Sequence, residues 1–364
     1  LGQAALLTAD PGAIRSPFFL LAPEFLRLPL TILATCAAIV ASQALISGAF
    51  SLTAQAVQMA IIPRFRIHHT SAQSIGQVFV PVINGLLALA CIILVIGFGT
   101  STALAGAYGV AIALTMVITS MLFFFAARSV WKWKWWKAAG LTTVFLLVDG
   151  MFLMANITKI VDGGWLPLVI AAVLLSLMLT WLWGRKRLSE QGDKQSLPTE
   201  LLIKELERGK IHRVSGMAVF MTGHKARLPG ALLHNLKHNQ VAHERILLLH
   251  VQTLDEPYAD ATEILEHEIL GQGLFRVTLK FGFADTPDVP KALLERLPEG
   301  MEFTPGKTTY FLGQETYRVG RGAGWFDRIR LSVFETMARN ASPATAHFML
   351  PPSRVVELGA QMTL

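Results

Sequence analysis

The stretch ASQALISGAFSLTAQAV, Ala41 to Val57, decides how the rest of this chain is interpreted. It lies inside an apolar run from about Leu28 to Ile62 that contains no charged residue. The stretch nevertheless carries hydroxyl and amide side chains, among them Ser42, Gln43, Ser47 and Ser51. In hydrocarbon such groups need partners from other helices or from water. The stretch therefore predicts a membrane helix that lines something polar.

Five apolar stretches are long enough to cross a membrane as helices, because about 20 residues suffice. They cover residues 28–52, 78–98, 103–127, 138–157 and 165–183. Core helices of a soluble protein are the alternative, but five such runs in succession with so few charges do not favour it. The sequence predicts an α-helical integral membrane domain over residues 1–187 and a second domain over residues 188–364.

The charges predict how the chain is oriented. Residues 1–187 carry a net charge of +8 and the remainder −1, and the basic residues follow the first, third and fifth spans. They are Arg64 and Arg66, then Arg128, Lys132, Lys134 and Lys137, and then Arg185, Lys186 and Arg187. Basic loops face the cytoplasm, so residues 1–27 are predicted to form an extracellular loop and the second domain to be cytosolic. Charges at the ends of apolar runs are not a nucleic-acid footprint.

Two side chains inside the spans are candidates for a role in ion movement. Tyr108 lies in AGAYGV, Ala105 to Val110, where a phenolic oxygen and backbone carbonyls could hold a dehydrated cation. Anchoring at the membrane interface is the alternative role for this tyrosine. Asp149 is the one acid within a span, and an intramembrane carboxylate is a functional candidate by default. Pairing with a neighbour or a place in a wet cleft remains the alternative for Asp149.

The second domain alternates helical and strand patterns, which predicts an α/β fold with a mixed sheet. Residues 189–196 are polar and are expected to form a flexible linker. Helices are predicted at 197–208, 228–237, 289–297 and 325–340. Strands are predicted at 217–221, 245–252, 263–270, 274–283 and 308–313, with Gly271-Gln272-Gly273 as a hairpin.

The second domain offers no convincing catalytic constellation, so we expect neither an enzyme nor a bound cofactor. His267-Glu268 lacks the second histidine of a zinc-protease helix. A loop with Gly320, Gly322 and Gly324 beside Arg318 and Arg321 could hold a phosphate, but it does not follow the strand-to-helix pattern of a nucleotide site, and a simple turn is the favoured interpretation.

Several long motifs resemble the Kup/HAK/KT family of potassium uptake permeases in its bacterial branch. Besides ASQALISGAFSLTAQAV, the resemblance rests on IPRFRIHHTS (Ile62 to Ser71), GQVFVPVIN (Gly76 to Asn84), ALAGAYGVAIALTM (Ala103 to Met116), GGWLPL (Gly163 to Leu168), ALLHNLKHNQVAHERILLL (Ala231 to Leu249) and PPSRVVELGAQ (Pro351 to Gln361). The motifs run through the whole chain in the family's order.

The resemblance implies a fold and a function. Family members have twelve spans in an amino-acid/polyamine/cation permease-like fold with an inverted repeat, and they import K⁺, typically with H⁺. This chain then looks like a carboxyl-terminal fragment that lacks the first seven spans and most cation ligands. Ser42, Gln43, Ser47 and Ser51 would lie on the eighth span and Tyr108 on the tenth.

The resemblance also implies a location and partners. The expected location is the bacterial inner membrane, in contact with the lipid bilayer and with the carboxyl terminus in the cytoplasm. Some relatives dimerise through the cytosolic domain or bind a cyclic dinucleotide there, so a homodimer and such a regulator are expectations for this chain. A regulatory or dimerisation module that does not itself transport is the alternative function.

Overall fold

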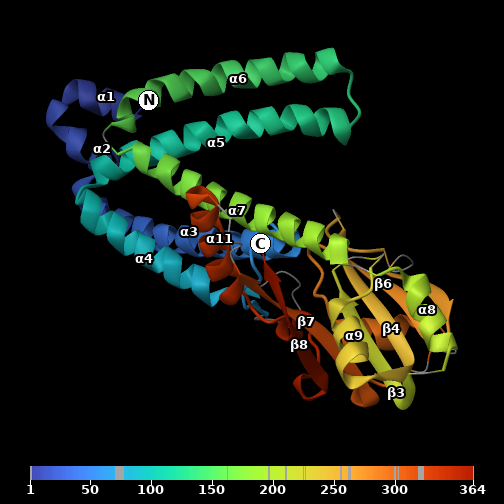
Figure 1. Ribbon diagram of the computed structural model, residues 1–364. Coiled ribbons are helices and arrows are strands. Elements are labelled where there is room, and N and C mark those ends of the chain that lie inside the picture. The colour runs from blue at the N-terminus through green and yellow to red at the C-terminus, as the bar shows by residue number, and fades with distance from the viewer. Residues whose placement is uncertain are drawn as a thin grey trace. The chain divides into compact units, whose positions relative to one another are not determined.

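The computed structural model describes residues 2–69, 78–161, 163–195, 197–209, 211–223, 225, 227–254, 256–260, 264–298, 301, 303–318 and 324–363 (Figure 1). The chain divides into two compact units. One comprises Leu1–Ala54 and Ile67–Leu87, and the other comprises Gln55–Arg66 and Ala88–Leu364.

The first unit contains short helices and most of one long helix. Three short helices, α1 (Gly2–Ala9), η1 (Pro11–Arg15) and α2 (Pro17–Leu20), occupy much of the region predicted as a loop. Helix α3 (Glu24–Gln58) begins four residues before the predicted span and contains Pro29 in its second turn. Pro29 has no backbone N–H to donate to the carbonyl of Phe25 four residues earlier, a loss that membrane helices tolerate where neighbouring groups satisfy the carbonyl. Strands β1 (His68–His69) and β2 (Val78–Phe79) pair antiparallel.

Within the described residues, five helices are long and apolar enough to cross a membrane, one over each of the five predicted stretches. Besides α3 they are α4 (Pro81–Phe98), α5 (Ser101–Ser129), α6 (Trp135–Ile157) and α7 (Trp165–Gln195), with a 3-10 turn, η2 (Thr158–Ile160), after α6. The predicted linker at residues 189–196 is wrong for residues 189–195, because α7 continues through them. Its polar residues carry no helix-breaking proline, so a helix already nucleated in the span extends into them.

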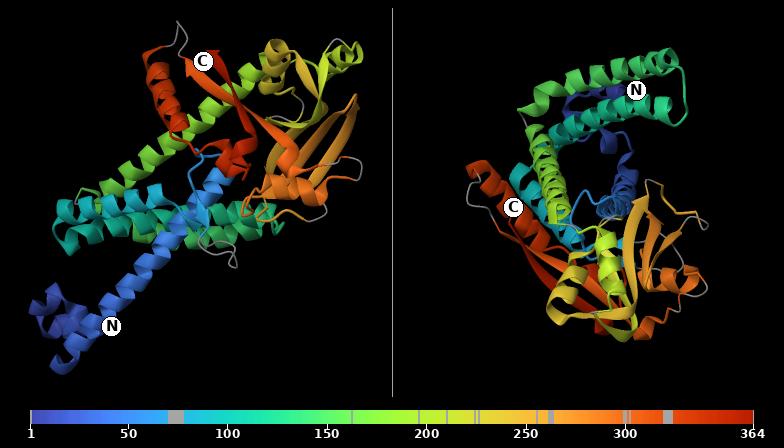
Figure 2. Two further views of the ribbon diagram at one scale, coloured as in Figure 1. Left: turned by 90° about the horizontal axis from the view of Figure 1, so that it is seen from below. Right: turned by 45° about the vertical axis from the view of Figure 1, so that its right-hand side comes forward.

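The second unit also contains a six-stranded sheet with the strand order β5-β6-β4-β3-β7-β8. Figure 2 shows the ribbon from two further sides. The strands are β3 (His212–Thr222), β4 (Val241–Leu254), β5 (Leu265–Gly271), β6 (Leu274–Gly282), β7 (Thr308–Arg318) and β8 (Val355–Thr363). Only β5 runs antiparallel to its neighbour, so the sheet is mixed as predicted. The predicted hairpin is confirmed, with Gly271 and Gly273 at φ values of 103° and 75° that favour glycine.

Helices complete the α/β domain. They are α8 (Thr199–Glu207), α9 (Gly230–His234) with a π-helical turn over Asn235–Asn239, α10 (Val289–Arg296), α11 (Trp325–Arg339) and α12 (Ala344–His347). The four predicted helices are confirmed. Strands β3, β4 and β7 are longer than predicted, and β8 was not predicted.

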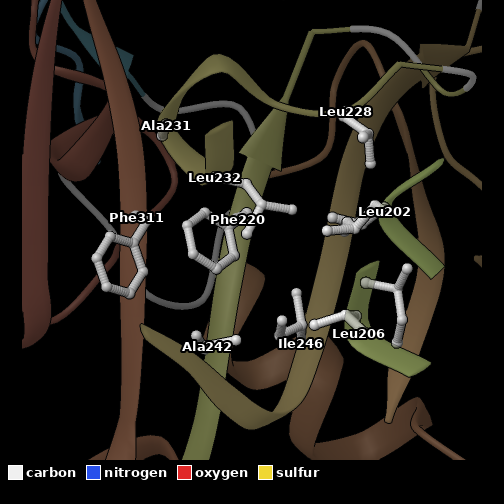
Figure 3. Close-up of a cluster of buried hydrophobic side chains, with 12 residues drawn as sticks. Leu202, Leu206, Phe220, Leu228, Ala231, Leu232, Ala242, Ile246 and Phe311 are labelled. Atoms are coloured by element: carbon white, nitrogen blue, oxygen red, sulfur yellow. The ribbon is translucent and has the colours of Figure 1, made fainter. Parts of the chain in front are cut away.

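Apolar side chains cover both faces of the sheet. On one face Phe220 of β3 stacks on Phe311 of β7 with 4.5 Å between ring centroids, beside leucines from α8 and α9 (Figure 3). On the other face Tyr310 and Leu293 are fully buried in a second cluster.

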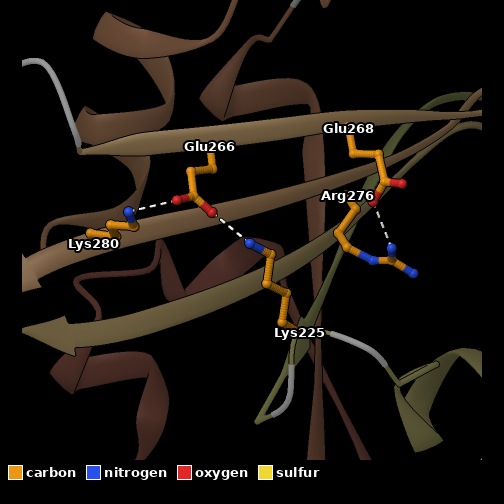
Figure 4. A network of polar contacts seen from close by, with 5 residues as sticks. All are labelled: Lys225, Glu266, Glu268, Arg276 and Lys280. Atoms are coloured by element: carbon orange, nitrogen blue, oxygen red, sulfur yellow. Dashed lines mark hydrogen bonds and ion pairs between the residues drawn. The ribbon is translucent and has the colours of Figure 1, made fainter.

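Ion pairs of the domain lie at the surface. In one of them Oε2 of Glu266 on β5 lies 2.5 Å from Nζ of Lys225, and Oε1 of the same residue lies 2.6 Å from Nζ of Lys280 (Figure 4).

Candidate functional site

Helices α5 and α6 run side by side, and what they bury between them is small or polar (Figure 1). On α5 the buried residues Ala113, Ser120 and Ala127 recur every seven residues, and on α6 the buried Thr142 and Asp149 are also seven apart. Seven residues are about two helical turns, so each set lies along one stripe of its helix. We call this contact the polar seam.

Asp149 lies at the centre of the polar seam. The hydroxyl Oγ of Ser120 donates a hydrogen bond to Oδ2 of Asp149 over 2.5 Å, and the two residues are 8% and 6% exposed. A serine in a membrane helix commonly donates to the carbonyl four residues earlier, whereas Ser120 donates to the neighbouring helix. Among the described residues, Asp149 has no basic ion-pair partner. The bond to Ser120 thus joins the carboxyl group of α6 to a hydroxyl group of α5.

The polar seam continues towards the end of α6 through Asn156, seven residues after Asp149. Its Nδ2 donates to the carbonyl of Phe152 over 2.9 Å, and Nζ of Lys159 donates to its Oδ1 over 3.2 Å. Gly109 of α5 makes this approach possible, because a Cβ there would lie 2.5 Å from Oδ1 of Asn156. Small residues that bring membrane helices close together leave room for such polar contacts.

Thr142 supplies a further polar atom to the polar seam. Its Oγ1 is buried and has no hydrogen-bond partner within the described part of the chain. A buried hydroxyl without a partner costs free energy unless water or an ion satisfies it. The stripe Thr142, Asp149 and Asn156 thus provides hydroxyl, carboxylate and amide oxygens along one face of α6.

The structure does not bring Tyr108 to Asp149. Tyr108 is 69% exposed on α5, whereas Asp149 is buried against Ser120. Tyr108 and Ser120 are twelve residues apart, which corresponds to about 18 Å along a helix. The two predicted residues therefore belong to different surroundings, and a direct role of Tyr108 with K⁺ stays a prediction.

The four predicted residues of α3 lie in the first unit. Ser42, Gln43 and Ser47 are exposed and Ser51 is half-buried. Exposed amides and hydroxyls in the middle of a helix of this hydropathy are unusual in lipid. Their role along an ion pathway stays a prediction.

The sequence reasoning missed three residues of the polar seam, namely Ser120, Thr142 and Asn156. The signal that could have found two of them is the spacing of seven residues from Asp149 in either direction along α6. Ser120 has no such signal, because its relation to Asp149 depends on how α5 and α6 pack.

The last residue of α3 and the segment after it meet the α/β domain within the second unit. Nε2 of Gln58 donates to the carbonyl of Asp285 over 3.4 Å, and the amide of Ser342 donates to the carbonyl of Arg64 over 2.6 Å. The guanidinium of Arg64 lies 5.4 Å from the ring centroid of Phe348. Burial, together with the charge of Arg64, lowers the pKa of His347 to about 4.

The described residues form no group of three or more His, Cys, Asp or Glu side chains that could hold a metal ion. Most of the glycine-rich loop considered for phosphate binding, including Gly320, Arg321 and Gly322, lies outside the described residues.

Comparisons with known proteins identify the family. Residues 1–186 match the family described as "K+ potassium transporter integral membrane domain", and residues 215–364 match "K+ potassium transporter C-terminal domain". The "Probable potassium transport system protein Kup" of Anaeromyxobacter dehalogenans (strain 2CP-C) is 48% identical over 370 residues, which cover all of this chain and 55% of that protein.

Relatives from other bacteria give the same result. Proteins of the same name from Erythrobacter litoralis and Zymomonas mobilis are 44% and 42% identical, and this chain covers 59% and 56% of their lengths. The chain thus spans little more than half of these relatives. With both family domains matched in order, and with five helices able to cross a membrane, this chain is a membrane protein that belongs to the potassium transporter family.

Proposed function

We propose that this chain is the carboxyl-terminal part of a secondary K⁺ uptake transporter that works as a K⁺/H⁺ symporter in the bacterial inner membrane. Membership of the potassium transporter family and full alignment with about half of the Kup relatives support this proposal. The whole protein would have the permease-like inverted-repeat fold, with seven spans before this chain. The cytosolic α/β domain would follow α7.

A single observation carries the coupling to protons: the bond between Ser120 and Asp149 inside a membrane helix pair. A buried carboxyl group with no basic partner among the described residues can take up a proton when the pathway exposes it to water. We assign Asp149 as the proton-binding group of this half, and we keep Ser42, Gln43, Ser47, Ser51 and Tyr108 as the side wall of the cation pathway.

Growth of a bacterial strain that lacks its own K⁺ uptake tests the proposal. The longer protein, with the seven earlier spans restored, is expected to rescue growth at low K⁺, and this chain alone is not. If the longer protein fails at low K⁺ although it reaches the membrane, the transporter proposal loses its support.

Uptake of Rb⁺ by the longer protein in vesicles tests the assigned residues. Asp149→Asn is expected to remove the stimulation of uptake by an inward proton gradient, because an amide side chain does not take up a proton at the pH of the assay. Tyr108→Phe is expected to weaken Rb⁺ uptake more than Trp133→Phe does. A proton-stimulated Asp149→Asn variant would contradict the role of Asp149, and equal uptake kinetics for the tyrosine and tryptophan variants would contradict Tyr108 as a ligand.

The second proposal is a regulatory or dimerisation module that does not transport. The exposed polar residues of α3 favour it for this chain alone, because a pathway wall needs helices opposite to it. A homodimer through the cytosolic domain and control by a cyclic dinucleotide belong to the same proposal. Light scattering of the purified chain and calorimetric titration with cyclic dinucleotides test these two properties separately.

A further inference from the structure

Helix α11 of the α/β domain packs against the end of α7, the last candidate membrane helix. Phe334 is fully buried there, with its ring centroid 5.3 Å from that of Trp181 and with Leu188 in the same cluster. Gly184 leaves room for the ring, because a Cβ at this position would overlap Phe334. The Phe334 ring can therefore pack against α7 only because residue 184 has no side chain.

Arg330 fixes α11 at the depth of the apolar part of α7. Its Nη2 donates to the carbonyl of Leu179 over 3.2 Å, and its guanidinium lies 4.4 Å from the ring centroid of Trp183. Arg187 lies 4.8 Å from the same ring. Leu179 and Trp183 both belong to the candidate span Trp165–Gln191. Tryptophans and arginines of this kind are typical of the border between hydrocarbon and headgroups.

Within the described part of the chain, a second apolar face of α11 is uncovered. Trp325, Phe326 and Ile329 are 75%, 62% and 55% exposed, and their spacing places them on one side of the helix. The rings of Trp325 and Phe326 also contact each other at 6.0 Å between centroids. A soluble domain rarely exposes such a group of large apolar side chains without a partner.

The charges beside this face indicate which partner covers it. Arg185 and Lys186 are exposed near the end of α7, two and three residues after Trp183, and Arg330 of α11 lies over the Trp183 ring. Amphipathic helices with aromatic side chains on one face and basic residues beside it lie in the membrane interface, where anionic headgroups attract the cations. The contact with α7 already holds α11 at the level of the membrane interface.

We propose that α11 lies in the membrane interface beside the end of α7, with Trp325, Phe326 and Ile329 immersed among lipid chains and with anionic lipid phosphates bound near Arg185 and Lys186. The inference rests on α7 crossing the membrane and is independent of K⁺ transport. It makes the α/β domain a membrane-attached domain rather than one suspended in solution.

Spin labelling of this chain in lipid vesicles tests the proposal. With Cys36 and Cys91 changed to serine, a nitroxide is attached at Ile329→Cys, and its collisions with oxygen and with a water-soluble nickel chelate are measured in vesicles containing phosphatidylglycerol. We expect more collisions with oxygen than with nickel, as for a label at Leu174→Cys on α7. Leu294→Cys on α10 is the matched control, because Leu294 is 60% exposed in the same domain and should give the opposite result.

Each other outcome overturns the proposal. A label at 329 that behaves like the one at 294 places α11 in water. Few collisions with either reagent mean that other protein helices cover the face. Spin–spin broadening that disappears on dilution with unlabelled chain means that a second copy covers it.

Two further comparisons test the attachment and the lipid charge. Gly184→Val should displace Phe334 and shift the label from lipid to water, whereas Gly140→Val, where a Cβ meets nothing within 4 Å, should not. An unchanged label in Gly184→Val would contradict the role of α7. Replacing phosphatidylglycerol with phosphatidylcholine should reduce the contact with lipid, and no change would contradict the binding of anionic headgroups.

Discussion

The α/β domain and the helix pair α5–α6 bury opposite kinds of side chains. The domain encloses large apolar residues such as Phe220 and Tyr310 and leaves its charged groups outside. The helix pair exposes large residues such as Phe125 and Leu147 and encloses alanines, hydroxyls and one carboxylate. The difference follows from the solvent. Water drives apolar groups together, whereas lipid does not, so membrane helices associate through close packing and polar bonds.

The largest expected effect is the loss of stability when a large buried side chain is removed from the α/β domain. Phe220→Ala should destabilise the α/β domain by about 3–5 kcal/mol, because it loses buried area and leaves a cavity beside Phe311. Phe125→Ala on α5 is the matched change at an exposed position, and it should alter stability in detergent by well under 1 kcal/mol. Urea denaturation followed by circular dichroism measures both. Equal losses would mean that the two regions do not differ as described.

The next effect tests whether the polar bond holds the helix pair together. Ser120→Ala and Asp149→Asn, singly and combined, form a double-mutant cycle on the 2.5 Å hydrogen bond. Because one partner is a carboxyl group in a water-poor site, we expect an interaction free energy of about 1–3 kcal/mol from thermal unfolding in detergent. Additive effects of the two changes would show that the bond does not contribute to packing.

A pH effect is expected in the α/β domain. Burial and Arg64 lower the pKa of His347 to about 4, whereas an unfolded chain gives a histidine pKa near 6.5. The folded state therefore resists protonation, and the stability from neutral His347 is present above about pH 6.5 and is lost as the pH falls towards 4. The ring is only partly shielded from solvent, so we expect a loss of about 1–2 kcal/mol between pH 7 and pH 5.

His347→Gln should remove this loss, and urea denaturation at the two pH values measures it. His267→Gln, at an exposed position on β5, is the control for the same substitution elsewhere in the domain. A His347→Gln variant with the same pH dependence as the parent chain would contradict the assignment.

The smallest effect concerns the surface charges of the α/β domain. Hydrogen bonds from Lys225 and then Lys280 lower the pKa of Glu266 to about 2. Because the Glu266 side chain is 44% exposed, water and salt screen these pairs, and Glu266→Gln should cost no more than about 1 kcal/mol at pH 7. Glu207→Gln on α8 is the control. A loss above 2 kcal/mol that persists in high salt would mean that the ion pairs are as important as the core.

The sequence alone predicted the elements with strong local patterns. The five long apolar stretches were predicted as helices because runs of this length with so few charges are typical of membrane helices. The β5–β6 hairpin was predicted because Gly271 and Gly273 permit its turn. Predictions failed where local composition was ambiguous. Residues 189–195 are polar enough for a linker but continue α7, and β8 carries Glu357 and Gly359 within a strand that is recognisable only beside β7.

For the candidate site, the sequence determined that a carboxylate lies within a span, because Asp149 is the one acid in its apolar run. Only the tertiary structure decided that Ser120 is its partner and that Tyr108 is not. The same holds for α11: a helix over residues 325–340 was predicted from sequence, but only the fold shows that Gly184 and Arg330 attach it to α7. Hydrophobic runs are local properties of a chain in a given solvent. Contacts between helices depend on their rotation and register, which packing of distant segments sets.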